Sequence, residues 1–448
     1  MKNKEISIKK KRKRQGNKGS IGMNIAIGVA VVIIIFVIVV LVIALNEGRS
    51  KNAGLKESQS EKVILNSEEE NKKEESNKTE QGEKIKAEER QIVLADNEYM
   101  HVEIDAEGKK VPVPNGYVGS SVGGENEENR INTGYVIYEG EEPITEANLA
   151  EARKTRNQYV WVPVPDASKI YGTDSKGKKW GKLYKFSTTG GDEVTGTSPD
   201  NWSESNGIMT IKDATGGREP DTLRDYDKDS QLKTLGLGVK TMHEFKMEME
   251  REFIKAIKSI EKYGGYYIGR YETGGLNGTA KIVKGDTDIE NQTWYTMYKK
   301  CKELAGANRN VETGLIWECE QDRVLMWLIE SGNKTKEQVC ENSKDWGNYS
   351  NNVVEYVTSS GSATTTTAGF NIRIPTGSSE QTKANNIYDL AGNVEEWGMA
   401  VYSTNSRRFG GGDCKYNSNY YPANFRGRSY PTGNGNYRLG CHATLYIR

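Results

Sequence analysis

Hydrophobic and polar positions divide the chain into four stretches. Residues 1–20 are rich in lysine and arginine, and an uncharged run dominated by isoleucine and valine follows within residues 21–45. Residues 46–90 are mostly Lys, Glu, Ser and Asn, and patterned apolar positions return over residues 91–448. The uncharged run matches the roughly 20 residues that a transmembrane helix needs. The pattern therefore predicts a basic tail, one membrane-spanning helix, a charged flexible stalk and a folded domain.

The charges beside the predicted span indicate its orientation. Lysine and arginine crowd the segment from Lys9 to Lys18, immediately before the uncharged run. Basic residues next to a spanning helix stay in the cytoplasm, so we expect a single-pass cell-membrane protein whose N-terminus is cytoplasmic and whose C-terminal domain is extracellular. The alternatives are a cleaved signal peptide and a nucleic-acid-binding tail. A signal peptide usually has a shorter apolar core and a small-residue cleavage site, which does not follow Leu45.

Helices are predicted at three places in the folded part. Thr241 and Glu244 form a capping box, and apolar residues then recur at helical spacing until Gly264. A second helix is predicted over residues 294–305, where aromatic and small residues share one face. A third is predicted around residues 317–328. The aromatic and methionine positions on these helices are interpreted as core packing rather than as a site.

Strands are short and separated by long loops. Apolar runs predict buried strands at residues 159–164, 266–271 and 443–447. Glycine, serine, threonine and asparagine dominate much of the rest of the C-terminal third. The domain is therefore predicted to be α+β. Residues 172–228 are long for a loop and predict an insertion.

Composition and charge exclude some classes of protein. The chain has 62 basic and 62 acidic residues, which argues against a dedicated nucleic-acid binder, so no nucleic-acid partner is expected. Its five cysteines include no CxxC pair, which excludes a zinc ribbon and a thioredoxin-like motif. Disulfides are compatible with an extracellular domain, but the sequence does not indicate which cysteines would pair.

One segment resembles a known family closely. Residues 386–397, Asn-Ile-Tyr-Asp-Leu-Ala-Gly-Asn-Val-Glu-Glu-Trp, are similar to the N-x-Y-D-M-x-G-N-V-W-E-W motif of the formylglycine-generating enzymes, also called sulfatase-modifying factors. Other segments that resemble this family, in order, are Val160–Pro163, Tyr266–Glu272, Trp294–Ala305, Gly411–Asp413 and Leu439–His442. The resemblance covers at least residues 159–448 and implies the family's variant of the C-type lectin-like fold.

The sequence differs from this family at the positions of the catalytic residues. The enzymes oxidise a substrate cysteine with two copper-binding cysteines, and at the matching positions this chain has Tyr416 and Tyr421. A phenol does not replace a thiolate as a Cu(I) ligand. A related iron-dependent branch uses clustered histidines, whereas the three histidines of this chain lie far apart. The domain is therefore predicted to lack the catalytic site, and neither copper nor iron is expected.

The resemblance also implies a structural calcium ion. Carried over by position, its ligands would be the carboxylates of Asp389 and Glu396 and the backbone carbonyls of Gly392 and Val394. Calcium accepts such mixed oxygen sets. The alternative is that this segment is only a turn, with Asp389 as a local cap.

A ligand-binding surface is predicted in the segment that follows. Tyrosine, asparagine, serine and glycine prevail between Asp413 and Tyr437, a composition typical of adaptable recognition surfaces. In the resembling enzymes this segment lines the substrate groove. The candidate contacts are Tyr416, Asn417, Asn419, Tyr420, Tyr421, Asn424, Arg426 and Asn436. The function predicted is binding of a protein or glycan ligand at the cell surface.

Two other functions remain open from the sequence. One is a formylglycine-generating oxidase that works through Cys414 and a second cysteine such as Cys441. The other is a structural protein of the cell envelope. A more specific form of the binding hypothesis is that residues 412–440 are rewritten by a diversity-generating retroelement, which mutates adenine-rich codons such as those for asparagine; some lectin-type folds of this family carry such a region.

Overall fold

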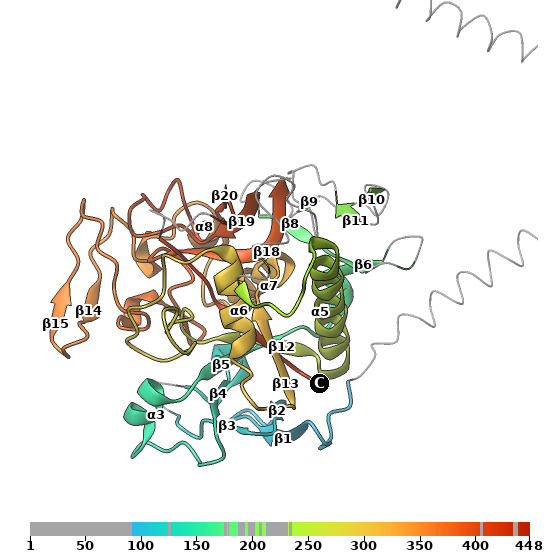
Figure 1. The fold of residues 1–448 in the computed structure, drawn as a ribbon. Helices are drawn as coiled ribbons and strands as arrows, with labels where there is room; N and C mark the ends of the chain where they lie inside the picture. The colour runs from blue at the N-terminus through green and yellow to red at the C-terminus, as the bar shows by residue number, and fades with distance from the viewer. Residues whose placement is uncertain are drawn as a thin grey trace, which may run out of the picture. The chain divides into compact units, whose positions relative to one another are not determined.

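The computed structural model describes most of the region from residue 92 to residue 448 (Figure 1). It leaves out residues 124–126, 174–176, 178, 187–192, 196–201, 206–207, 212–231, 233–234, 404–405 and 433–437. No helix in the described part is long and apolar enough to cross a membrane. The predicted tail, span and stalk lie outside the described residues. Gln91–Arg448 is a compact unit and is treated by itself.

A six-stranded antiparallel sheet forms the centre of this unit. Its strand order is β13-β22-β12-β5-β4-β3. The strands are β3 (Tyr117–Gly119), β4 (Val136–Glu139), β5 (Gln158–Pro163), β12 (Gly265–Gly269), β13 (Val311–Leu315) and β22 (Ala443–Ile447). Every residue of β12 and β22 is buried, because apolar side chains cover both faces of these central strands. The three predicted strands are confirmed, with ends that differ by no more than two residues.

Three longer helices pack around this sheet. They are α5 (Met242–Tyr263), α6 (Trp294–Glu303) and α7 (Glu318–Glu330). The predicted capping box is confirmed, since Thr241 Oγ1 accepts a hydrogen bond of 3.1 Å from the Glu244 amide, and Gly264 ends α5 in the left-handed conformation. Phe245 joins α5 to α6 through an edge-on contact of 5.2 Å with the ring of Tyr298. Two shorter helices are α3 (Leu149–Thr155) and α8 (Lys336–Cys340).

A second sheet of four strands carries the C-terminal segments. Its order is β20-β19-β18-β21, and only the β18–β21 pair is parallel. The strands are β18 (Glu395–Ser403), β19 (Ser406–Gly410), β20 (Arg426–Ser429) and β21 (Leu439–Gly440). Only Cys441 and His442 separate β21 from β22, so the chain passes from the second sheet to the central sheet at these two residues.

Six two-stranded hairpins lie outside these two sheets. They are β1 (Met100–Ile104) with β2 (Lys110–Pro114), β6 (Tyr171–Thr173) with β7 (Lys179–Gly181), β8 (Leu183–Lys185) with β9 (Glu193–Thr195), β10 (Trp202–Ser205) with β11 (Ile208–Ile211), β14 (Glu355–Val357) with β15 (Ala363–Thr365), and β16 (Lys383–Ala384) with β17 (Ile387–Tyr388). Much of the predicted insertion, residues 172–228, lies outside the described residues. The α+β class is confirmed, with more sheet than helix in the described part.

Candidate functional site

The segment that carries the family resemblance has an unusual backbone. Asn385, Asn386, Asp389, Gly392 and Asn393 all adopt positive φ angles, between 44° and 75°. Asn and Asp tolerate this region better than other side chains, although it still costs energy for any residue with a Cβ. Such a concentration persists only where the surroundings determine the backbone conformation, and it marks the segment as a candidate site.

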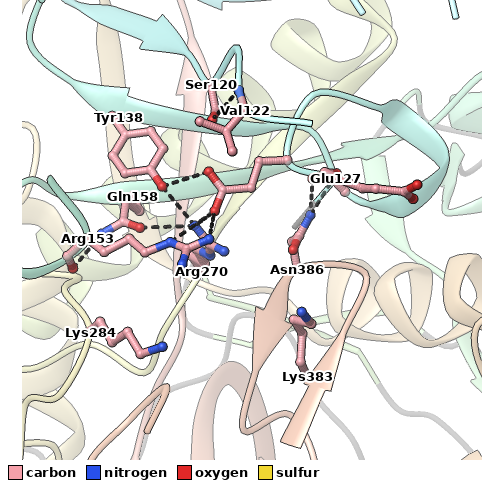
Figure 2. A network of polar contacts seen from close by, with 12 residues as sticks. Ser120, Val122, Glu127, Tyr138, Arg153, Gln158, Arg270, Lys284, Lys383 and Asn386 are labelled. Carbon is pink, nitrogen blue, oxygen red and sulfur yellow. Dashed lines mark hydrogen bonds and ion pairs between the residues drawn. The ribbon is translucent and has the colours of Figure 1, made fainter. Parts of the chain in front are cut away.

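A buried polar network lies beneath this segment. Figure 2 shows Tyr138, Arg153, Gln158 and Arg270 converging at one place. The Glu128 carboxylate is at its centre, 2.7 Å from Arg270 Nη1, and it accepts hydrogen bonds of 2.8 Å from the Tyr138 hydroxyl and 3.1 Å from Arg153 Nε. Burial alone would raise the pKa of Glu128, but the charges of Arg270 and Arg153 outweigh it and lower the pKa to about 2.

This network is joined to the positive-φ segment by short contacts. Asn386 Nδ2 donates to the Gly134 carbonyl at 2.9 Å and to the Glu127 carbonyl at 3.2 Å (Figure 2). The Tyr388 amide donates to the Arg270 carbonyl at 2.9 Å, and the Arg270 guanidinium lies 5.7 Å from the centre of the Tyr388 ring. The segment is therefore fixed on one side by a largely buried ion-pair network.

Two residues beyond Arg270, Glu272 enters a second buried cluster. Its Oε2 atom accepts a hydrogen bond of 2.8 Å from Asn393 Nδ2, and its Oε1 atom has no partner among the described residues. Burial raises the pKa of Glu272 well above its usual value, and the nearby carboxyls of Asp389 and Glu396 raise it further. Glu272 thus lies close, in the interior, to two acidic side chains from a distant segment of the sequence.

The other two acids have protein partners on one side and, at Asp389, an oxygen on the other side that no described residue pairs with. Asp389 Oδ2 accepts hydrogen bonds from Thr376 Oγ1 at 2.9 Å and the Gly377 amide at 2.8 Å, while its Oδ1 atom has no partner within the described ranges. Burial raises the pKa of Asp389. Glu396 Oε1 lies 2.6 Å from His442 Nδ1. The remaining nitrogen of this buried histidine, Nε2, has no described partner either.

The predicted calcium ligands lie on one continuous segment, which contributes Asp389 and Glu396 to this cluster. Among the described residues, no group of three or more His, Cys, Asp or Glu side chains is arranged to hold a metal ion. The unpartnered oxygens of Glu272 and Asp389 are nevertheless the hard donors that calcium prefers. Glu272 was absent from the predicted set, although it ends the family-like segment Tyr266–Glu272. The calcium site, with Asp389, Gly392, Val394 and Glu396 as ligands, stays a prediction.

The first part of the predicted ligand surface, which runs from Asp413 to Tyr437, forms a loop. We define the tyrosine loop as residues 413–424, between Gly412 and the start of β20. Its base is fixed by Ser418, whose buried hydroxyl donates to Asn342 Oδ1 at 2.7 Å and accepts from Asn351 Nδ2 at 3.1 Å. Main-chain contacts add to this, since the Ser350 amide donates to the Tyr416 carbonyl at 3.0 Å and the Asn424 amide donates to the Val339 carbonyl at 3.2 Å.

The tip of the tyrosine loop presents aromatic and amide side chains. Asn417 closes the tip, because its carbonyl accepts hydrogen bonds from the amides of Tyr420 and Tyr421 at 3.0 and 3.1 Å. The rings of Tyr416 and Tyr421 stack, with centres 4.2 Å apart. Tyr420 is 77% exposed and Asn419 is also exposed. Tyr416, Asn417, Tyr421 and Asn424 are half-buried, so six of the predicted contacts share this loop.

Two predicted contacts fall elsewhere. Arg426 begins β20, and its guanidinium pairs with the buried carboxylate of Asp322 and donates to the Tyr184 carbonyl at 3.1 Å. Its charge is therefore compensated within the protein. Asn436 lies outside the described residues. One exposed aromatic residue nearby, Phe370, was not predicted from the sequence; it is 63% exposed. Its loop is joined to the tyrosine loop through Ser350, whose carbonyl accepts a hydrogen bond from the Gly369 amide and whose amide donates to the Tyr416 carbonyl.

Cys414 and Cys441 do not form a pair that could bind copper together. Cys414 is buried, its sulfur contacts the Arg438 guanidinium, and burial raises the pKa of its thiol to about 12. Cys441, suggested above as a partner for Cys414, instead lies beside Cys301. Stacked phenol rings occupy the two positions that match the copper-binding cysteines of the resembling enzymes.

Comparison with known proteins adds little to this description. No family model matches the chain, and no curated protein matches it. A solved structure, Treponema denticola variable protein 1, is similar to it at 17% sequence identity, over 41% of this chain and 85% of that one, with a TM-score of 0.26. A likeness at that TM-score supports no conclusion about the fold or the function.

Proposed function

We propose that this chain is a membrane-anchored cell-surface binding protein, with a C-type lectin-like domain of the sulfatase-modifying-factor type that recognises a protein or glycan through the tyrosine loop. The observation that supports this most is Tyr420, a large aromatic side chain that is 77% exposed at the tip of an otherwise well-anchored loop. Large exposed aromatic residues on ordered loops are typical interface anchors.

The fixed base of the loop favours binding. Ser418 is buried and hydrogen-bonded at the base, and the Asn417 carbonyl holds the tip closed, so the loop has little conformational freedom to lose when a ligand binds. The exposed Asn419 and half-buried Asn424 supply amide groups beside the aromatic rings. Aromatic rings combined with amides suit both sugar rings and peptide backbones.

Calcium is part of the proposal as a structural ion. Its binding beside Glu272 and Asp389 would compensate the negative charge of two carboxylates whose pKa values burial raises, and would hold the positive-φ segment in place. The Tyr416–Tyr421 stack at the positions of the copper ligands supports a binding role without copper or iron.

The proposal is tested by removing the exposed ring. Covering the exposed three-quarters of a tyrosine is worth roughly 2–3 kcal/mol, so Tyr420→Ala should weaken attachment by roughly 30- to 150-fold. Attachment of the full chain, displayed on cells, is measured on a glycan array and on whole cells. Ile104→Ala is the control, since Ile104 is 58% exposed on β1 and should not affect attachment. Unchanged attachment by folded Tyr420→Ala protein would place the ligand surface elsewhere.

The rival oxidase has its own test. If the purified protein bound copper and converted the cysteine of a sulfatase-type peptide to formylglycine, the binding proposal would be overturned. Replacement of Cys414 by serine should then abolish the conversion, whereas the binding proposal expects this variant to attach normally, because the Cys414 sulfur is buried against Arg438.

A further inference from the structure

Two cysteines from distant parts of the sequence meet in the interior. Cys301 lies on α6, and Cys441 lies between β21 and β22, 140 residues further along the chain. Their sulfur atoms are 3.5 Å apart, and both residues are fully buried. The Met297 sulfur lies 3.7 Å from that of Cys441, so the immediate surroundings include a third soft, apolar group.

The position of this pair is fixed by its neighbours. The Cys441 carbonyl accepts a hydrogen bond of 2.8 Å from the Thr273 amide, next to the buried acid Glu272. Cys301 belongs to the buried face of α6. A disulfide has its sulfurs about 2.0 Å apart, so each sulfur would have to move by less than about 1 Å, which small side-chain rotations supply.

We propose that Cys301 and Cys441 form a disulfide bond in the exported protein. The inference rests on the extracellular location that is part of the proposed function, because thiols in the cytoplasm stay reduced. Forming the bond removes one proton from each thiol and two electrons from the pair. A disulfide-carrying oxidoreductase or a small-molecule disulfide outside the cytoplasm accepts both electrons and both protons and is reduced to two thiols. Since no oxidant reaches fully buried sulfurs, the bond forms while the chain folds.

The bond would hold together the parts of the molecule that build the acidic cluster. Cys441 is one of the two residues that carry the chain from the second sheet to the central sheet, and the other, His442, contacts Glu396 at 2.6 Å. Linking Cys441 to α6 would therefore fix this crossing point and keep His442 against Glu396. The other cysteines have different environments, since Cys414 contacts Arg438 and the Cys319 sulfur packs against Gly181.

The test is thiol mapping of the full chain. Membranes from expressing cells are precipitated with acid to stop thiol exchange and redissolved near neutral pH in denaturant with excess N-ethylmaleimide. The protein is then digested with trypsin without reduction. The expected result is a cross-linked product of the peptides Cys301–Lys302 and Leu439–Arg448, with the alkylating agent only on Cys319, Cys340 and Cys414. Cys301→Ser should abolish the cross-link and add label to Cys441, whereas Cys414→Ser should leave the cross-link intact.

A second arm separates the pairing from the location. Protease added to intact cells shows whether the C-terminal domain is outside. If it is outside and both cysteines are alkylated without reduction, the disulfide is refuted. If it is inside, the location is wrong, and the full chain in detergent is refolded from the reduced, denatured state with oxidised glutathione. A Cys301–Cys441 cross-link in the refolded protein would then support the pairing, and its absence would refute it.

Discussion

The buried ion-pair network around Glu128 allows a quantitative prediction. Glu128→Gln keeps the shape of the side chain but removes the charge that compensates Arg270, which is 1% exposed, and Arg153, which is 14% exposed. The pKa of Glu128 is lowered from 4.5 to about 2, and each pKa unit corresponds to about 1.4 kcal/mol. The substitution should therefore lower the free energy of unfolding at pH 7 by about 3 kcal/mol, within the range known for breaking a buried pair.

The pH dependence has a definite sign. Because the pKa of this carboxyl is lower in the folded than in the unfolded protein, its stabilisation is present above about pH 4.5 and is lost as the pH falls toward 2. The difference in stability between the native protein and Glu128→Gln should shrink from about 3 kcal/mol at pH 7 toward zero near pH 2. Urea denaturation followed by tryptophan fluorescence at a series of pH values measures it.

A matched control comes from an exposed pair. Glu142 contacts Arg156 but is 69% exposed, so Glu142→Gln should cost no more than about 1 kcal/mol at any pH. The reasoning would be refuted if Glu128→Gln also cost less than about 1 kcal/mol at pH 7. A large but pH-independent cost would equally refute it, because it would show a packing defect rather than a lost charge.

Four further predictions concern the calcium site, the loop, the domain boundary and the coding DNA. Removing calcium with EDTA from loaded protein should lower the unfolding temperature, and the decrease should be larger at pH 8 than at pH 5. The reason is that the raised pKa values of Glu272 and Asp389 let protons compete with the calcium ion at the lower pH. No change in unfolding temperature would contradict the calcium site. Ser418→Ala should cost about 0.5–1.5 kcal/mol of stability, measured by urea denaturation, because it removes the buried hydroxyl that bonds Asn342 and Asn351, whereas exposed Ser360→Ala should cost little. Limited proteolysis should cut within residues 46–90 and release a stable fragment, and an additional cut near residues 215–235 would argue against a single domain. If the C-terminal segment is rewritten by a retroelement, sequencing of the neighbouring DNA should show an adenine-rich near-copy of it and a reverse transcriptase gene; their absence would exclude that version of the binding hypothesis.

Local features of the fold were predictable from the sequence. The boundaries of α5 follow from a capping box and a terminal glycine, which act over a few residues. The strands β5, β12 and β22 are continuous apolar runs, and their burial on both faces makes them recognisable without knowledge of their neighbours. These signals depend only on adjacent positions, which is why one sequence reveals them.

The contacts that build the candidate sites were not predictable in the same way. Glu272 meets Asp389 across more than a hundred residues, and no periodicity indicates that encounter. Cys301 and Cys441 are likewise brought together only by the packing of α6 against the central sheet. The inward pairing of Arg426 with Asp322 also depends on tertiary structure, whereas the exposure of Tyr420 agrees with the composition of its loop. Tertiary packing, rather than sequence pattern, decides the contacts of Glu272, Cys301 and Arg426.

The way the tyrosine loop is held has a consequence for its evolution. The loop starts at Gly412, where any other residue would place its Cβ 2.4 Å from the Tyr421 carbonyl oxygen. The tip is closed by hydrogen bonds to the Asn417 carbonyl. These constraints act on main-chain atoms and on the buried Ser418, not on the outward-facing side chains of Asn419 and Tyr420. The outer positions can therefore accept many different amino acids while the base remains unchanged, so new ligand specificities can arise without a loss of folding.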